Sequence, residues 1–90
     1  MLYKLAFVKA SSYRTKIMKS LAKQNKTPKQ LSTELKIHQN NISATLKELK
    51  DKGLVDVVNP AAKKGRYYRL TIAGKDMVEN LEYIYLSIYY

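Results

Sequence analysis

A change of periodicity at Gly53 constrains the fold of this chain more than any other feature. Before it, Ile42, Leu46 and Leu49 recur at the spacing of one face of an amphipathic helix. Directly after it, residues 54–58 read Leu-Val-Asp-Val-Val, which has the two-residue period of a half-buried strand. Glycine commonly ends a helix in the left-handed conformation. The sequence therefore predicts a helix that stops at Gly53 and is followed at once by a strand.

Start and stop signals place the neighbouring elements. Residues 27–30 read Thr-Pro-Lys-Gln, which is the pattern of a capping box with proline at the first helical position. They predict the start of a short helix. Residues 36–37 leave room only for a tight turn before the next helix, which is predicted over residues 39–52. Behind the first strand, residues 59–66 are expected to form a basic loop, and residues 66–70 a second strand.

The N-terminal third is expected to be helical as well. Residues 1–10 fit either a helix or a strand, and we favour the helix. Residues 11–12 are serines, and either of them can cap the helix that follows. In that helix Tyr13, Ile17 and Leu21 recur every four residues, which is the spacing of a buried face.

The order of these elements predicts the fold class. After the N-terminal segment come a helix, a short helix, a tight turn, a longer helix, a hairpin and a last helix that Thr71 can cap. A helix-turn-helix followed by a two-stranded hairpin is a winged helix. We therefore expect a mainly α protein with a small β-hairpin (α+β), formed by one domain over residues 1–90. Its parts would be an N-terminal segment (1–10), a winged-helix core (11–72) and an added C-terminal dimerisation helix (73–90).

The charge of the chain indicates a polyanionic partner. There are 17 lysines and arginines against 7 acids, a formal net charge of +10, and residues 1–33 contain no acid at all. A field of this kind attracts DNA, RNA or an acidic membrane. The alternative is that lysine only keeps a small protein soluble.

Several classes of site are excluded or not expected. The sequence has no cysteine and a single histidine, so disulfides and thiolate metal sites are excluded, and a reducing cytoplasmic location is expected. No apolar run approaches the roughly 18 residues of a membrane span. A nucleophile–base pair, a metal cluster and a phosphate-binding loop are all missing from the sequence. We therefore expect neither an enzyme nor a cofactor.

Short polar side chains are concentrated in the helix predicted over residues 39–52. If its apolar stripe faces inward, the outward face carries no acid in its first turns. Asn and Gln can form paired hydrogen bonds with adenine, Lys can reach guanine, and Ala can contact a thymine methyl group. The alternative is that these side chains simply face water. The residues that we expect to read base edges are Gln39, Asn40, Ser43, Ala44 and Lys47.

Basic and polar residues on both sides of this helix are candidates for phosphate contacts. The amides at the start of the short helix form an anion site. The tip of the loop at residues 59–66 can grip phosphates or enter the minor groove. The expected contacts to the DNA backbone are Lys26, Thr27, Lys29, His38, Lys50, Lys63, Lys64 and Arg66.

The C-terminal residues 83–90 carry no charge and include four tyrosines. A terminal helix that is apolar on nearly every side cannot be covered by one core of this size, and tyrosine suits interfaces. We expect a homodimer interface, although the segment could also fold back on its own domain or fray. A small-molecule effector, if there is one, would bind at that interface. The expected interface residues are Leu2, Leu5, Val78, Leu81, Ile84, Tyr85, Ile88 and Tyr89.

Residues 11–80 resemble winged-helix transcriptional regulators of the MarR and ArsR type, especially compact archaeal members. The resemblance is carried by residues 46–49 (Leu-Lys-Glu-Leu), 53–55 (Gly-Leu-Val) and 59–71, which read like the wing of those regulators. It implies a homodimeric regulator that binds specific sites on double-stranded DNA. The alternatives are a non-specific architectural nucleic-acid binder and a winged helix used for protein contacts.

The sequence departs from these regulators at a few positions. Lys36 stands where glycine is usual, and a left-handed backbone there would cost about 1 kcal/mol. Ala44 and Thr45 replace arginine and histidine of many relatives, so no DNA sequence preference is carried over. The cysteines of the metal-sensing branch are absent.

Overall fold

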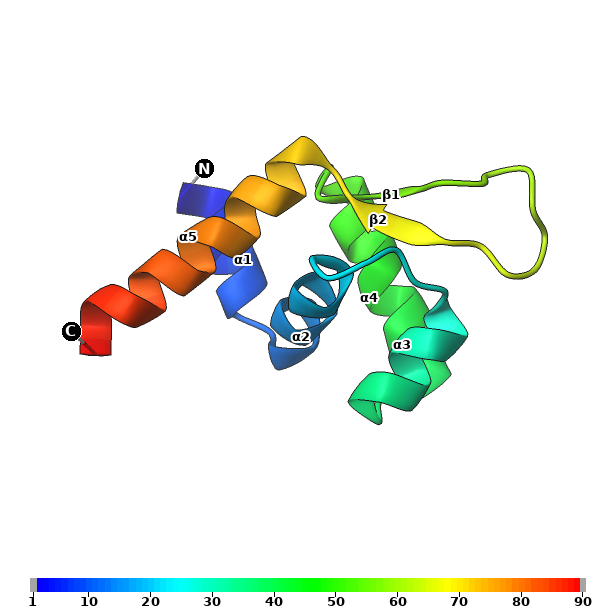
Figure 1. Cartoon of the computed structure of the whole chain (residues 1–90), viewed down its shortest axis with the longest axis horizontal. Helices are drawn as coiled ribbons and strands as arrows, with labels where there is room; N and C mark the ends of the chain where they lie inside the picture. The colour runs from blue at the N-terminus through cyan, green and yellow to red at the C-terminus, as the bar shows by residue number, and fades with distance from the viewer. Residues whose placement is uncertain (1, 90) are drawn as a thin grey trace.

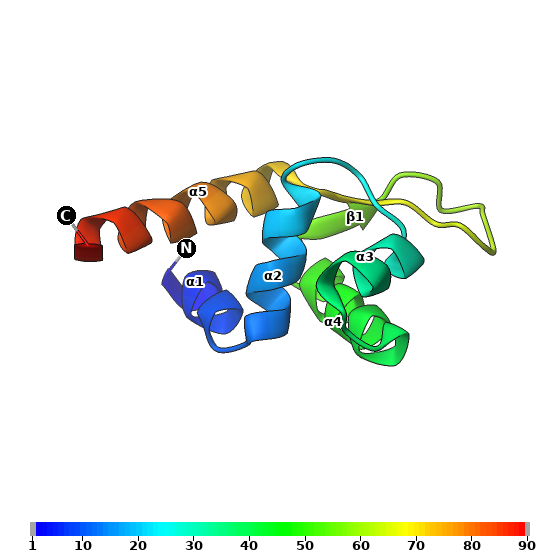
Figure 2. The ribbon, with the colours of Figure 1, turned by 60° about the horizontal axis from the view of Figure 1, so that its bottom comes forward.

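The computed structural model describes the backbone of residues 2–89 and the side chains of residues 3–81. The described residues form five helices and a two-stranded antiparallel hairpin, which is the predicted fold class. Helices α2, α3 and α4 lie together in the middle of the molecule, and the loop of the hairpin projects from one end (Figures 1 and 2). Helix α5 extends toward the other end, with α1 packed beside it. The elements are α1 (Leu2–Lys9), α2 (Ser12–Leu21), α3 (Pro28–Leu35), α4 (Gln39–Asp51), β1 (Val55–Val57), β2 (Tyr68–Leu70) and α5 (Ile72–Tyr89).

Helix α2 begins as the serines predict. Ser11 is the N-cap in extended conformation, and its hydroxyl accepts a hydrogen bond from the Arg14 backbone N–H at 3.3 Å. Ile17 and Leu21 are buried in the core as expected. Tyr13 is not: its side chain is 39% exposed, because it lies in the first turn, before α2 enters the core.

The predicted capping box at the start of α3 is confirmed. The Thr27 hydroxyl accepts a hydrogen bond from the Gln30 N–H at 3.1 Å, and the Gln30 side chain accepts one from the Thr27 N–H at 2.9 Å. The helix ends at Lys36, whose φ of 57° and ψ of 41° are left-handed. This conformation makes the tight turn, and a non-glycine residue adopts it at a cost of roughly 1 kcal/mol.

Helix α4 has the buried face that the periodicity predicts, since Ile42, Leu46 and Leu49 are all buried. Gly53 adopts a φ of 73°, and the Leu54 N–H donates to the Leu49 carbonyl at 2.9 Å. This is the hydrogen bond of a Schellman motif, which terminates a helix through a left-handed residue. The chain enters β1 two residues later.

The hairpin is in the expected place, with shorter strands than expected. Val55 pairs with Leu70, and Val57 pairs with Tyr68, over only three residues of each strand. Val55, Val57 and Leu70 are buried, while Tyr67 is 41% exposed. The backbone of Lys26 also exchanges two hydrogen bonds with Tyr68, which ties the segment before α3 to the hairpin.

The two ends of the chain pack on the same core. Val8 of α1 and Met77 of α5 are fully buried in the cluster that also contains Ile17 and Leu46. Thr71 caps α5 as predicted, because its hydroxyl accepts a hydrogen bond from the Gly74 N–H at 3.1 Å. Gly74 allows α5 to approach the backbone of Leu54 closely, since a Cβ at position 74 would lie 2.1 Å from the Leu54 carbonyl oxygen.

This packing corrects part of the predicted dimer interface. Leu5, Val78 and Leu81 are at most 8% exposed within a single chain, where they join α1 to α5. They stabilise the protomer and have little surface left to offer a second copy. The side chains of the other predicted interface residues lie outside those that the structure describes; they are Leu2, Ile84, Tyr85, Ile88 and Tyr89.

Candidate nucleic-acid interface

The outward face of α4 carries short polar side chains and one lysine. With the apolar stripe buried, the five residues predicted to read bases are all exposed. Thr45 is buried and donates from its hydroxyl to the Asn41 carbonyl at 2.7 Å, so it belongs to the inner face. No acid occurs on α4 before Glu48. The exposed residues are Gln39, Asn40, Ser43, Ala44 and Lys47.

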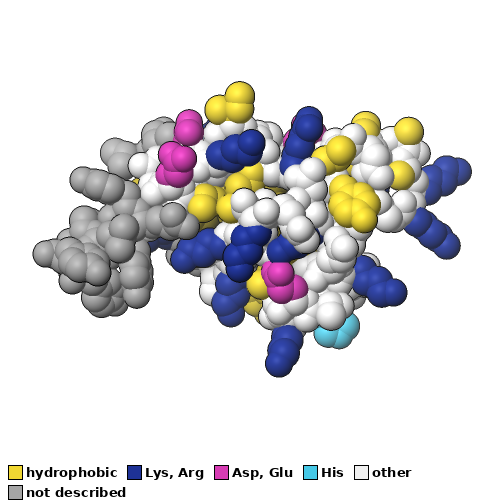
Figure 3. Space-filling model, in the orientation of Figure 1, with side chains coloured by type: hydrophobic (Ala, Val, Ile, Leu, Met, Phe, Trp, Pro, Cys, Tyr) yellow, Lys and Arg dark blue, Asp and Glu magenta, His cyan; other side chains and the backbone are white. Residues whose placement is uncertain are grey.

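An open groove lies beside the start of this face. It has a volume of about 460 Å³ and is lined by three separate elements: the start of α3, the first residue of α4 and the loop of the hairpin. Figure 3 shows basic side chains around this part of the molecule and no acid beside them on the face that it presents. The lining residues are Thr27, Pro28, Lys29, Gln39, Lys63, Lys64 and Gly65.

The groove has the electrostatics of an anion site. Lys29, Lys63 and Lys64 are exposed and contribute three cations to its walls. Helix α3 begins at Pro28, so the positive end of its dipole faces the same space. Backbone amides at a helix N-terminus bind phosphate when cations stand beside them. The structure thus brings together four of the predicted backbone contacts, Thr27 included.

Hydrogen bonds within the loop hold the wing in shape. The Asn59 side chain donates to the Gly65 carbonyl at 3.2 Å and accepts from the Tyr67 N–H at 2.8 Å. The Arg66 guanidinium donates to the carbonyls of Ala62 at 2.7 Å and Pro60 at 3.1 Å. Arg66, predicted as a phosphate contact, therefore uses part of its hydrogen-bonding capacity within the loop. Lys63 and Lys64 are exposed to solvent.

The prediction for Lys26 is wrong. Its side chain is buried, and its ammonium group donates to the Glu34 carboxylate at 2.7 Å and to the Ser20 hydroxyl at 2.6 Å. The Ser20 hydroxyl also donates to the same carboxylate. The hydrogen bonds from Lys26 and then Ser20 lower the pKa of Glu34 below its usual value of 4.5. Lys26 therefore joins α2 to α3 and does not face the groove.

Two further predicted contacts lie outside the groove. His38 occupies the N-cap position of α4, is exposed, and makes no capping hydrogen bond with its side chain. Lys50 is exposed in the last turn of α4, at the end of the helix away from the groove. Both remain predictions as phosphate contacts.

Arg14 is a positioning residue that the sequence did not reveal. Its guanidinium stacks over the Phe7 ring at 3.8 Å, donates to the Phe7 carbonyl at 2.8 Å and pairs with the Glu48 carboxylate at 2.7 Å. It thereby links α1 and α2 to α4. A separation of 34 residues between Arg14 and Glu48 leaves no local pattern that would have predicted the pair.

The described residues contain neither a metal-binding cluster nor a membrane-spanning helix. No group of three or more potential ligands among His, Cys, Asp and Glu lies close enough to hold a metal ion. None of the described helices combines the length and the apolar character needed to cross a membrane.

Comparison with known proteins places the fold. The chain aligns with ZitR from Lactococcus lactis (22% identity, TM-score 0.77), covering 88% of this chain but only 57% of that one. It aligns with HlyU from Vibrio cholerae (27% identity, TM-score 0.74), covering 94% and 88%. It also aligns with the winged helix-turn-helix DNA-binding domain of Mb0332 from Mycobacterium bovis, described as homodimeric (24% identity, TM-score 0.72), covering 97% and 77%. No curated protein matches the sequence significantly.

The family is shown by the sequence itself. Residues 11–57, which are more than half of the chain, match the family described as bacterial regulatory protein, arsR family. That range runs from the cap of α2 to the end of β1 and so contains the whole helix-turn-helix. The chain is therefore a member of the ArsR family of regulatory proteins, with a winged helix-turn-helix fold.

Proposed function

We propose that this protein is a transcription regulator that binds specific sites on double-stranded DNA. In this proposal α4 lies in the major groove, where Asn40, Ser43 and Lys47 meet base edges. Gln39 stands at the leading edge of that face, and Ala44 offers its methyl group to a thymine. Membership of a family of regulatory proteins supports this function, as does the net charge of +10.

The groove shared by α3, α4 and the wing carries the proposal. Its three lysines and its helix N-terminus form one anion-binding site at the end of the proposed reading face. A phosphate held there by Lys29 and Lys63 would fix the register of Gln39 and Asn40 on the bases, because backbone contacts position a protein and base contacts specify the sequence. This arrangement favours DNA over a protein partner, which needs no phosphate site beside a polar helix.

We further propose that the protein acts as a homodimer. The helices α1 and α5 lie together at the end of the molecule away from the wing (Figure 1), so a second copy could dock there without covering α4. Residues 83–90 carry no charge in the sequence, a composition that suits such a contact. A two-fold axis would place two reading helices about one turn of B-DNA apart, roughly 34–36 Å.

Selection from random duplex DNA tests the proposed function. A specific dimer predicts enrichment of a palindromic site and binding about 10³-fold or more tighter than to shuffled duplex at the same salt concentration. Light scattering of the free protein at micromolar concentration should give the mass of two chains. Enrichment of no sequence would overturn the specificity and favour an architectural binder, whereas a single half-site and the mass of one chain would overturn the dimer alone.

A further inference from the structure

A strongly basic surface lies where α2 meets the last turn of α3. Lys16 and Lys19 of α2, and Lys23 just beyond its end, are all exposed and line an open depression of about 190 Å³. Figure 3 shows basic side chains gathered over this middle part of the molecule, which Figure 1 identifies as α2 and α3. We call these three lysines the α2 surface. The other residues that line the depression are Ser20, Glu34 and Leu35.

The carboxylate beside the α2 surface is already paired. Glu34 accepts hydrogen bonds from the Lys26 ammonium group at 2.7 Å and from the Ser20 hydroxyl, and Lys26 is itself buried. The charges of Lys26 and Glu34 therefore offset each other. Among residues 3–81 no carboxylate lies within ion-pair distance of the three lysines of the α2 surface. Their positive charge is left unbalanced within the chain.

Like charges repeat along this face at helical spacing. Lys16 and Lys19 are three residues apart, Lys19 and Lys23 are four apart, and Ala22 between them keeps helical dihedral angles. Like charges at these spacings destabilise a helix. A polyanion laid along the face would remove that repulsion, which no ion pair within residues 3–81 does.

The spacing of the lysines matches the charge density of a DNA strand. At 1.5 Å per residue, Lys16 and Lys23 lie about 10 Å apart along the helix axis. One strand of a DNA duplex carries a phosphate about every 3.4 Å of its axis, so three lysines over this length match about three phosphates. Protein interfaces are enriched in aromatic side chains and depleted in lysine, and no aromatic residue lines the depression. The chemistry therefore favours a DNA backbone over an acidic protein.

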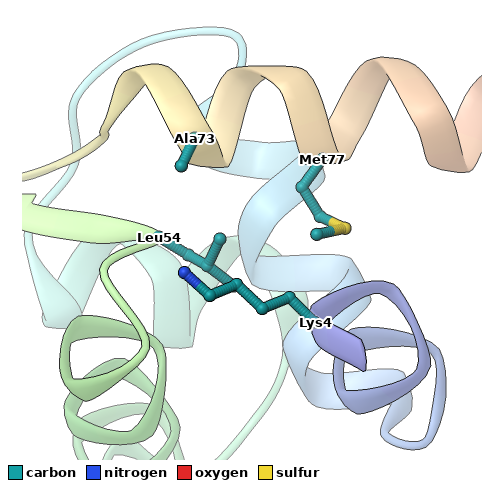
Figure 4. Close-up of a pocket in the computed structure, with 4 residues that line it drawn as sticks. All are labelled: Lys4, Leu54, Ala73 and Met77. Carbon is teal, nitrogen blue, oxygen red and sulfur yellow. The ribbon is translucent and has the colours of Figure 1, made fainter. Parts of the chain in front are cut away.

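The hollow between α1 and α5 differs from the α2 surface. Figure 4 shows a single lysine there, Lys4, together with Leu54, Ala73 and Met77. One cation beside apolar side chains cannot match a row of phosphates.

The α2 surface is distinct from the proposed DNA-reading interface. The groove beside α4 adjoins the start of α3 at Pro28, whereas the depression on α2 adjoins the end of α3 at Leu35, and the two share no lining residue. In both ribbon views α3 lies between α2 and the tip of the wing (Figures 1 and 2). A duplex seated on the wing and α4 therefore leaves the α2 surface open to another segment of DNA.

We propose that Lys16, Lys19 and Lys23 bind the sugar–phosphate backbone of a second DNA segment, so that the protein bridges two stretches of duplex. The first of these stretches is the one that α4 reads, so the bridge rests on the proposed function. Three phosphate contacts bind weakly by themselves. Many chains on one DNA molecule act together, because the first contact raises the effective concentration for the next.

A bridging assay with the full chain tests the α2 surface. DNA that carries many copies of the selected site is fixed to beads and saturated with protein, and unbound protein is washed away. A labelled duplex of shuffled sequence is then added at low salt, and the captured label is measured. The proposal predicts capture that falls steeply as the salt concentration rises. Absence of capture would overturn it.

Paired variants test the assigned lysines. The double variant Lys19→Gln and Lys23→Gln should capture about tenfold less label or lower still, because two of three phosphate contacts are lost. The control Lys9→Gln and Lys75→Gln removes the same charge from exposed positions of α1 and α5 and should capture as the unaltered protein does. Both double variants should bind a single selected site with unchanged affinity. Equal capture by the two double variants would overturn the proposal. A loss of single-site affinity confined to the Lys19 and Lys23 variant would also overturn it, by placing these lysines on the duplex that α4 reads.

Competition and sequence selection separate the remaining outcomes. If polyglutamate displaces the labelled duplex as well as unlabelled DNA of equal charge does, the α2 surface takes acidic protein and the assignment to DNA is overturned. Specific binding without capture would overturn the second surface and leave the proposed function standing. Capture by a protein that selects no sequence, with shuffled duplex on the beads, would contradict the proposed function and support the α2 surface.

Discussion

The Arg14 guanidinium of α2 pairs with the Glu48 carboxylate of α4 at 2.7 Å, and its central carbon lies 3.8 Å from the centre of the Phe7 ring of α1. Three helices thus meet at one side chain. Arg14 is largely buried, whereas Glu48 is about half exposed. The pair thus forms an ionic link between α2 and the exposed side of α4.

Removing Glu48 should destabilise the protein. Glu48→Ala leaves the largely buried guanidinium without its carboxylate, which should cost about 1 kcal/mol and lower Tm by about 4–8 °C in a domain of this size. Thermal unfolding followed by circular dichroism measures this. Asp51→Ala is the matched control, since it removes an acid from the same helix that forms no ion pair among the described residues. Equal Tm values for the two variants would contradict a structural role for the pair.

The left-handed turn between α3 and α4 predicts a stabilising substitution. Lys36 has a φ of 57°, a conformation that glycine adopts without steric cost. Lys36→Gly should raise the free energy of unfolding by up to about 1 kcal/mol, somewhat offset by the greater freedom of glycine in the unfolded chain. Urea unfolding measures this free energy, and the slope of the free energy against urea concentration should be the same for both proteins. A loss of stability would show that the lysine side chain contributes more than the strain costs.

The lowered pKa of Glu34 makes stability depend on pH in a defined direction. Hydrogen bonds from Lys26 and Ser20 favour the charged carboxylate in the folded state. The contribution is therefore present above the unfolded pKa, near 4.5, and is lost as pH falls through the lower folded pKa. Between pH 7 and pH 3 the native protein should lose more stability than Glu34→Gln does. Parallel stability curves for the two proteins, measured by urea unfolding at each pH, would refute this assignment.

The wing lysines should determine part of the salt dependence of DNA binding. If Lys63 and Lys64 each contact one phosphate, replacing both with alanine should flatten the slope of log affinity against log salt by about 2. Binding to all duplexes should weaken alike, because such contacts carry no sequence information. The double variant Lys9→Ala and Lys75→Ala removes the same charge from exposed positions outside the groove and should leave the slope nearly unchanged. Identical slopes for both double variants would exclude the wing from the interface.

Local signals in the sequence were sufficient for most of the fold. The capping box at Thr27, the left-handed glycine at Gly53 and the apolar stripe from Ile42 to Leu49 each involve residues within a few positions of one another, and the structure confirms all three. These features act through short-range hydrogen bonds and helical spacing, which are readable without knowledge of the tertiary fold.

Pairings over longer separations were not predictable in the same way. From the sequence, Lys26 resembles a free cation beside a helix start. The carboxylate that pairs with it belongs to Glu34, 8 residues further on, in the last turn of α3. Leu5 and Leu81 looked like interface residues because an apolar pattern shows that a side chain will be buried but does not show which surface will bury it. The groove depended on a loop and two helices meeting in space, so only its separate members were predicted.

Asn40 allows the most direct test of the claim that α4 reads DNA sequence. Asn40→Ala and the matched control Asn25→Ala, at an exposed position before α3, are compared on the selected site, on its single-base variants and on shuffled duplex at one salt concentration. The proposal predicts that Asn40→Ala loses about 1–3 kcal/mol on the selected site, relaxes the preference at one base pair and binds shuffled duplex as before. An equal loss on every duplex, or a preference as sharp as that of the Asn25→Ala control, would contradict it.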